Sequence, residues 1–224
     1  IVAGLNFVKN NAVFAKDRAI SAFPAPYGTS CLDGGCSSGT PLGRVIIFGN
    51  LTPTVDNPAT ADDNEDVASI TLRAPVIGRT PVFNPANPTD PASDYKAFGT
   101  LDRFNFAPYN YLLIPLKRYG GFVNFRQEIG SDTHFTVKAL YNRRDSKNQA
   151  APLPLFVGPD AGNGNLLDTI VISASNPYNP FHVDLNSSNF SFIGRRLVEA
   201  GPRRYDQQVK TFYGTATLDG QFAI

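Results

Sequence analysis

The stretch between Pro115 and Arg144 constrains the fold more than any other part of the chain, because its pattern predicts a β-hairpin with one apolar and one polar face. Successive side chains of a strand point to opposite faces of a sheet. Apolar and small residues alternate with polar ones on both sides of an expected turn at 129–132. The apolar face is predicted to hold Tyr119, Gly121, Val123, Phe125, Phe135, Val137, Ala139 and Tyr141. The polar face is predicted to hold Asn124, Arg126, Glu128, Thr136, Lys138, Asn142 and Arg144, with Phe122 as an exception.

Long irregular segments flank this hairpin. Residues 21–107 and 145–189 are rich in Pro, Gly, Asn and Asp, which predicts two long loops. The first contains only short apolar runs, such as 45–48 and 70–72, and is expected to hold small strands or turns of its own. Further strands are expected in 1–18, 104–116 and 190–222, and no long helix is expected. A tight turn at one end and long loops at the other are typical of a membrane barrel. A soluble sandwich keeps both kinds of connection short.

The predicted fold class is therefore all-β, with antiparallel strands that form part of a transmembrane β-barrel over residues 1–224. Short turns are expected on the periplasmic side and long loops on the extracellular side. No apolar run approaches the roughly 18 residues of a spanning helix, so any membrane crossing falls to strands. The sequence contains no Met, and a complete gene product begins with Met, so we expect a processed chain or a fragment.

Two cysteines lie close together, and Gly34 and Gly35 between them favour a chain reversal. We predict a disulfide between Cys31 and Cys36, formed in an oxidising compartment. The alternative is a pair of free thiols in a cytosolic loop. A metal site is disfavoured because no second Cys pair or His cluster accompanies them. The acidic run 62–66 resembles the start of a calcium loop, but Val67 stands where that loop needs Gly, so we expect a solvated loop tip.

Composition and motifs exclude several classes of function. A net charge of +1 argues against a nucleic-acid surface, which is usually strongly basic. No nucleophile elbow, phosphate loop or metal-binding His pair is present. We therefore predict that the chain is not an enzyme and uses no cofactor or metal.

Several segments resemble the barrel domain of TonB-dependent outer-membrane receptors. The most specific combination is the Asn-Pro-Tyr-Asn-Pro-Phe run at 176–181, followed by Arg195-Arg196 and by Glu199-Ala-Gly-Pro-Arg203. The remaining similarity lies in 14–21, 109–119, 139–154 and 213–222. Together these segments cover most of the chain apart from the middle of the first long loop.

The resemblance implies a large barrel of about 22 strands, plugged by an N-terminal domain, in the outer membrane of a bacterial cell. Such receptors take up scarce nutrients such as iron chelates, vitamins or glycans. The implied partners are outer-membrane lipid, the rest of the receptor with its plug, the TonB complex and a small-molecule ligand. Neither a plug nor a TonB-contact segment is recognisable in this sequence, which therefore resembles an internal slice of a barrel.

Within that reading, one set of polar residues is expected to face the lumen: Arg126, Lys138, Asn142, Thr211 and Asp219. These side chains would either contact ligand or hydrate the wall and touch the plug. Tyr178 and Phe181 are candidates for stacking on a ligand, with packing of the loop against itself as the alternative. A different function remains open at this point, namely a secreted or cell-surface β-sandwich for adhesion or assembly. In that fold the apolar strand faces would meet each other in a core.

Overall fold

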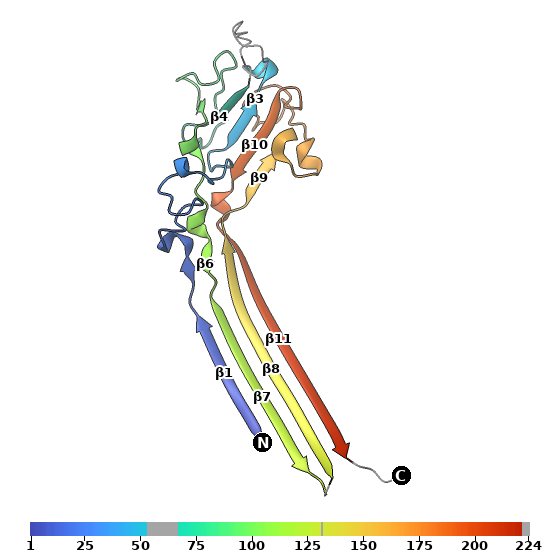
Figure 1. Ribbon diagram of the computed structural model, residues 1–224. Helices are drawn as coiled ribbons and strands as arrows, with labels where there is room; N and C mark the ends of the chain where they lie inside the picture. The colour runs from blue at the N-terminus through green and yellow to red at the C-terminus, as the bar shows by residue number, and fades with distance from the viewer. Residues whose placement is uncertain (53–66, 131, 221–224) are drawn as a thin grey trace, which may run out of the picture. The chain divides into compact units, whose positions relative to one another are not determined.

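The computed structural model describes residues 1–52, 67–130 and 132–220, and these residues are all-β (Figure 1). The helical segments among them are three-residue 3₁₀ turns. None of the helices in the described residues is long and apolar enough to span a membrane. The chain divides into two compact units. The first contains 1–17, 109–150 and the segment from Arg203 onward, and the second contains the described parts of 18–108 together with 151–202.

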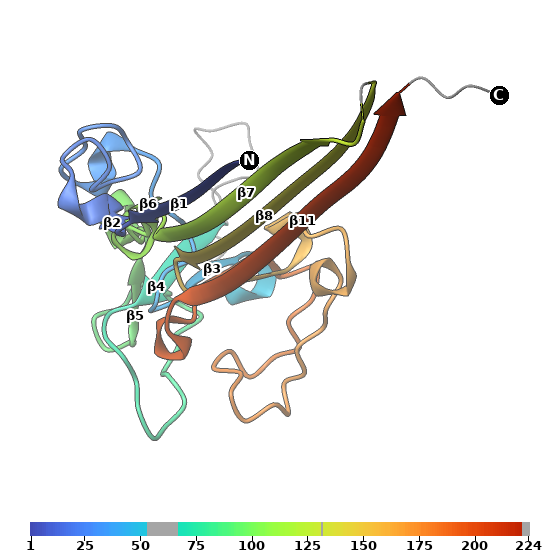
Figure 2. The ribbon, with the colours of Figure 1, turned by 90° about the horizontal axis from the view of Figure 1, so that it is seen from below.

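The first unit is built on a sheet of four long antiparallel strands (Figures 1 and 2). Its strand order is β1-β7-β8-β11, and the strands are β1 (Val2–Asn10), β7 (Leu116–Glu128), β8 (Thr133–Ala150) and β11 (Arg203–Gly220). A two-stranded ladder of β2 (Val13–Phe14) and β6 (Tyr111–Leu113) and the 3₁₀ turn η1 (Ala15–Asp17) complete the unit. The predicted all-β, antiparallel character is confirmed.

The register of this sheet confirms the predicted hairpin. In β7 and β8, Phe125 lies opposite Val137 and Arg126 lies opposite Thr136. The turn between the two strands begins with the Ile129 N–H donating to the Thr133 carbonyl over 2.8 Å. Residues directly opposite each other in an antiparallel pair lie on the same face, so the register aligns apolar residues with apolar ones across the sheet.

The other expected strands differ in length from the prediction. The strand expected over 1–18 ends at Asn10, and only Val13–Phe14 pairs again. Near 104–116 the chain makes a 3₁₀ turn, η6 (Ala107–Tyr109), before β6, because Pro108 and Pro115 have no N–H to donate to a ladder. The strand expected over 190–222 is two strands, since Gly201, with φ +74°, and Pro202 interrupt it. Conversely, β8 continues to Ala150, so the second long connection begins after Ala150 instead of at Asp145.

The second unit contains a five-stranded antiparallel sheet with its own core. Its strand order is β5-β4-β3-β10-β9, and the strands are β5 (Tyr95–Ala97), β4 (Ala68–Leu72), β3 (Arg44–Ile47), β10 (Phe190–Arg196) and β9 (Pro154–Val157). The core beneath it includes Ile47, Leu51, Ile70, Leu185 and Phe190. The short apolar runs at 45–48 and 70–72 fall largely within β3 and β4. The two segments expected to be loops fold together, because each supplies only a few apolar residues and the combined set makes one core.

Tyr95 provides a pH-sensitive element in this core. Its side chain is 5% exposed and packs against the rings of Phe83 and Phe181, with centroids 5.9 and 6.0 Å away. Burial raises the pKa of the Tyr95 phenol well above its usual value, and the neighbouring Asp94 carboxylate raises it further.

We therefore expect the protein to lose stability at alkaline pH through Tyr95. The folded chain holds this proton at pH values where the unfolded chain releases it, so the free energy of unfolding falls as pH rises above about 10. Subtracting the phenolate absorbance of Tyr95→Phe from that of the wild type at each pH isolates the titration of Tyr95. Equal alkaline slopes of unfolding free energy in the two proteins would contradict the expectation.

Candidate functional site

The five side chains predicted to line a lumen share one face of the four-stranded sheet. Arg126 lies opposite Thr136, and Lys138 lies opposite Asn124 and Thr215. Asn142 is paired with Thr211, and Asp219 with His134. We call this surface the polar face. Of the five predicted residues, only Asn142 and Thr211 are direct neighbours, and the others occupy separate rows.

Asn142 and Thr211 lie beside two arginines that the sequence pattern did not single out as site residues. Arg118 and Arg144 are directly opposite each other in β7 and β8. Together with Val209 they enclose a hollow of about 350 Å³. A second hollow of about 220 Å³ adjoins it and shares Arg118 and Asn142. We refer to Arg118, Asn142, Arg144 and Thr211 as the arginine site.

The arginine site has unsatisfied polar capacity. Arg144 donates to the Gln207 side chain over 3.3 Å. In the described part of the chain, neither Arg118 nor Arg144 has a carboxylate within 4.0 Å. The Oδ1 atom of Asn142 is buried and receives no hydrogen bond from the described residues. Like charges directly opposite each other in a sheet are destabilising, so the site is suited to an anionic group that would lie between the guanidinium groups.

A glycine makes room beside this site. A side chain at Gly120 would collide with the amide of Asn6, which lies across the β7 backbone at this point. Gly120 is paired with both Asn6 and Asn142. Its lack of a Cβ therefore leaves room for the Asn6 amide on the polar face, beside the arginine site.

The opposite end of the polar face carries a cluster of one histidine and two acidic side chains. His134 lies between two carboxylates, with its ring nitrogens 3.7 Å from Glu128 and 3.7 Å from Asp219. The predicted lumen residue Asp219 thus belongs to this acidic end and is separate from the arginine site. Nothing in either group supplies a nucleophile held by a base.

Tyr178 and Phe181, the predicted stacking residues, have opposite environments. The Tyr178 side chain is 85% exposed. Phe181 is 7% exposed and packs against Phe83, with ring centroids 4.6 Å apart. The interpretation of Phe181 as a ligand-stacking residue is therefore corrected, because its ring is enclosed in the core of the second unit.

Asn179 explains why the Asn-Pro-Tyr-Asn-Pro-Phe run turns Phe181 inward. The Asn179 amide is buried and donates to the carbonyls of Ser173 and Val183 over 3.1 and 2.8 Å. Its oxygen accepts the Phe181 N–H over 3.0 Å. One side chain thus closes the loop, and this part of the motif has a structural role.

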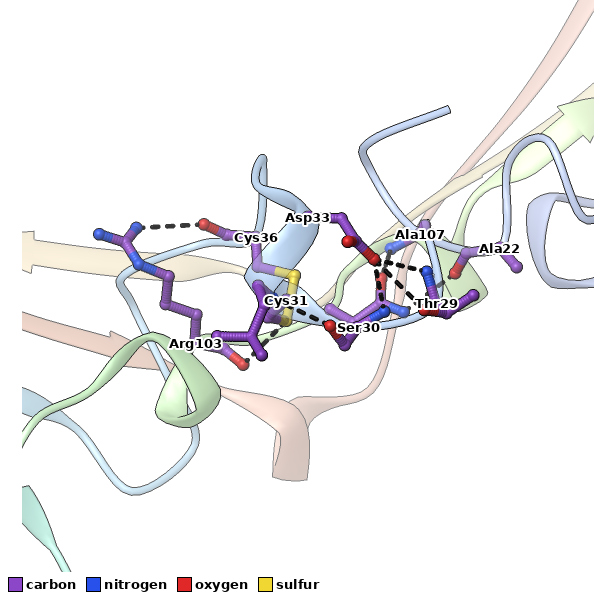
Figure 3. The surroundings of a disulfide bond; sticks show 10 residues. Ala22, Thr29, Ser30, Cys31, Asp33, Cys36, Arg103 and Ala107 are labelled. Atoms are coloured by element: carbon purple, nitrogen blue, oxygen red, sulfur yellow. Dashed lines mark hydrogen bonds between the residues drawn. A yellow bond between two sulfur atoms is a disulfide. The ribbon is translucent and has the colours of Figure 1, made fainter. Parts of the chain in front are cut away.

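The predicted disulfide is present (Figure 3). Cys31 begins a 3₁₀ turn, η2 (Cys31–Asp33), which Ser30 and the Asp33 carboxylate cap. Gly34 and Gly35 then adopt φ values of +98° and +75°, which glycine adopts without strain and which return the chain to Cys36. Arg103 donates to the Cys36 carbonyl over 3.3 Å, tying the small ring to a distant part of the second unit.

We expect reduction of this disulfide to lower the free energy of unfolding by about 2 kcal/mol, which is the loop-closure contribution for such a short ring. The comparison is between urea unfolding with and without reductant, followed by circular dichroism. In the double variant Cys31→Ala/Cys36→Ala, reductant should have no effect. If reductant leaves the urea unfolding midpoint of the wild type unchanged, the expectation is contradicted.

In the described residues, no group of three or more His, Cys, Asp or Glu side chains is placed to hold a metal ion. The acidic run 62–66 lies outside the described residues. Comparisons with protein-family models, curated proteins and solved structures find no match to this chain.

Proposed function

We propose that this chain forms part of the wall of a TonB-dependent receptor barrel in a bacterial outer membrane. The observation that supports this most is the two-sidedness of the four-stranded sheet. Opposite the polar face, apolar side chains are aligned in rows across its strands. One row is Ala3, Val123, Ala139 and Gly214, and the next is Phe125, Val137 and Ala216. We call this surface the apolar face. Its residues suit contact with hydrocarbon.

The exposure of the apolar face favours lipid contact over a sandwich core. Leu5 is 94% exposed and Phe212 is 75% exposed. In a soluble sandwich these side chains would be covered by a second sheet. A bilayer covers them without any further protein. This observation counts against the alternative of a secreted adhesion or assembly sandwich.

Strand length and aromatic placement also support the proposal. A strand needs about 9–11 residues to cross a bilayer. The strands β8 and β11 have 18 residues each, β7 has 13 and β1 has 9. On the apolar face Phe7 packs on Tyr119 toward one end, and Phe125 lies near Phe135 toward the other. Outer-membrane barrels carry aromatic girdles at both interfaces.

In this proposal the polar face lines the lumen. The arginine site binds carboxylates of the plug or an anionic group of the transported nutrient, and the long connections contribute to ligand capture. The nutrient is a scarce small molecule of the iron-chelate, vitamin or glycan type. Energy for uptake comes through the TonB complex, which contacts other parts of the receptor.

Labels on neighbouring residues test the orientation of the sheet. Ala139→Cys places a fluorophore on the apolar face, and Lys138→Cys places one on the polar face of the same strand. In bilayers of lipids with brominated chains, the first label should be strongly quenched and the second should not. Equal quenching of both labels, or a chain that stays monodisperse in water without detergent or lipid, would count against the proposal.

A further inference from the structure

Basic side chains gather on the apolar face in the row of Phe7 and Tyr119 and in the next row beyond it. Lys9 is directly opposite Lys117 in the ladder of β1 and β7. Arg143 is directly opposite Lys210 in the ladder of β8 and β11. These residues continue the alternation of Phe7, Tyr119, Tyr141 and Phe212, so they lie on the same face as the apolar rows. The two pairs lie in adjacent rows, and a pair of like charges directly opposite each other is unfavourable unless another group neutralises it.

The acidic side chains on this part of the face are already engaged. Asp145 accepts from Arg143 over 3.0 Å and from Gln208 over 2.8 Å. Asp206 lies 3.7 Å from Lys147. In the described part of the chain, the remaining three lysines have no carboxylate within 4.0 Å. Lys117 is directly opposite Asp145 in the ladder of β7 and β8, at a longer distance. The three lysines are exposed, and we call them the lysine cluster: Lys9, Lys117 and Lys210.

We propose that the lysine cluster binds the phosphate groups of anionic lipids in the leaflet at that end of the sheet. The inference rests on the proposed function, because it requires the adjoining apolar rows to be covered by acyl chains. An anion that binds the lysines at this place lies beside those acyl chains, so it must itself be attached to an acyl chain. A lipid phosphate satisfies both conditions, since its charge complements the lysines and its acyl chains continue onto Tyr119 and Leu5.

A lysine side chain suits the boundary between the acyl chains and the headgroups of a membrane. A long aliphatic stem packs along apolar surface while the ammonium group reaches the polar headgroups. An ammonium is a compact charge whose three N–H groups can donate to phosphate oxygens in many orientations. It therefore does not require one fixed headgroup geometry. Lys9 and Lys117 line a hollow of about 450 Å³ that gives space for a headgroup, and Lys147, Asp145 and Asp206 also line it. Lys210 lies outside this hollow.

The test uses the full chain in zwitterionic detergent micelles. It is titrated with dihexanoyl phosphatidylglycerol, with dihexanoyl phosphatidylcholine and with inorganic phosphate, and binding is followed by phosphorus NMR line width. Near an anionic surface each lysine contributes roughly fivefold in affinity, so Lys9→Gln/Lys117→Gln/Lys210→Gln should weaken phosphatidylglycerol binding by about a hundredfold. The same three positions changed to Arg should retain binding, because the charge is kept.

A matched control removes three cations from the opposite face through Arg118→Gln/Arg126→Gln/Lys138→Gln. This variant should keep the preference for phosphatidylglycerol. An equal loss in the control would overturn the inference in favour of net charge alone. If the lysine-to-glutamine variant keeps the preference for phosphatidylglycerol, the inference is wrong. If inorganic phosphate binds as tightly as phosphatidylglycerol, the bound phosphate need not belong to a lipid, and the inference is wrong in that respect. Failure of the proposed function is distinguishable, because then the brominated-lipid experiment shows no difference between the two faces.

Discussion

Ala139→Arg is expected to lower the free energy of unfolding in lipid or detergent by about 2–4 kcal/mol, the cost of an arginine on the lipid face of a barrel near the bilayer midplane. Ala139 lies in the row with Ala3, Val123 and Gly214, between the Phe7–Tyr119 pair and Phe125 on the apolar face. An arginine there would face hydrocarbon, and no acid lies in its row. Urea unfolding in micelles or bilayers, followed by circular dichroism, measures the change.

The neighbouring substitution Leu140→Arg is the matched control. It changes the same strand by one residue, but the side chain falls on the polar face, opposite Phe122. The expected change is below about 1 kcal/mol, as for ordinary surface substitutions. Equal costs at the two positions would mean that the two faces do not meet different solvents.

Phe190→Ala is expected to destabilise the second unit by about 3–5 kcal/mol, because the lost side chain leaves a cavity that the surrounding core fills only in part. Phe190 is 0% exposed and begins β10, where it is paired with Ile47 of β3. The chain contains no Trp, so near-UV circular dichroism of its nine tyrosines, including the buried Tyr95, is a suitable readout.

Tyr178→Ala is the control for this second prediction, because its ring is exposed and its loss removes no core contact. Its effect should stay within about 0.5 kcal/mol. A Phe190→Ala protein as stable as the Tyr178→Ala protein would show that the second unit does not depend on the core around Ile47 and Leu185.

The hairpin was predictable because its information is local. The alternation of residues 119–128 and 133–144 and a turn containing Gly130 fix which side chains share a face. The spacing of Cys31 and Cys36, with two glycines between them, likewise predicted their bond. In both cases the residues that interact lie near one another in the sequence.

The arginine site and the core around Phe181 were not predictable in this way. The Arg118–Arg144 pair depends on the register between two strands, and a shift by one residue would send one of the two to the other face. Phe181 is buried by residues such as Phe83 and Tyr95, which lie roughly a hundred positions earlier in the sequence. The flanking prolines allowed packing of the loop against itself as an alternative, but they did not identify these distant partners.

The arrangement of the second unit has a consequence for the order of folding. Its central strands β3 and β10 come from distant parts of the chain, and Asn189 shares a hydrogen bond with Asn50, 139 positions earlier. Contacts of such long sequence separation form slowly, because the intervening chain must lose much of its freedom first. The β7–β8 hairpin is complete before β10 has been synthesised. Until β10 is synthesised, the segment that contains β3 therefore has one strand edge without its partner. A cell that makes this protein has to keep that edge from pairing with another chain.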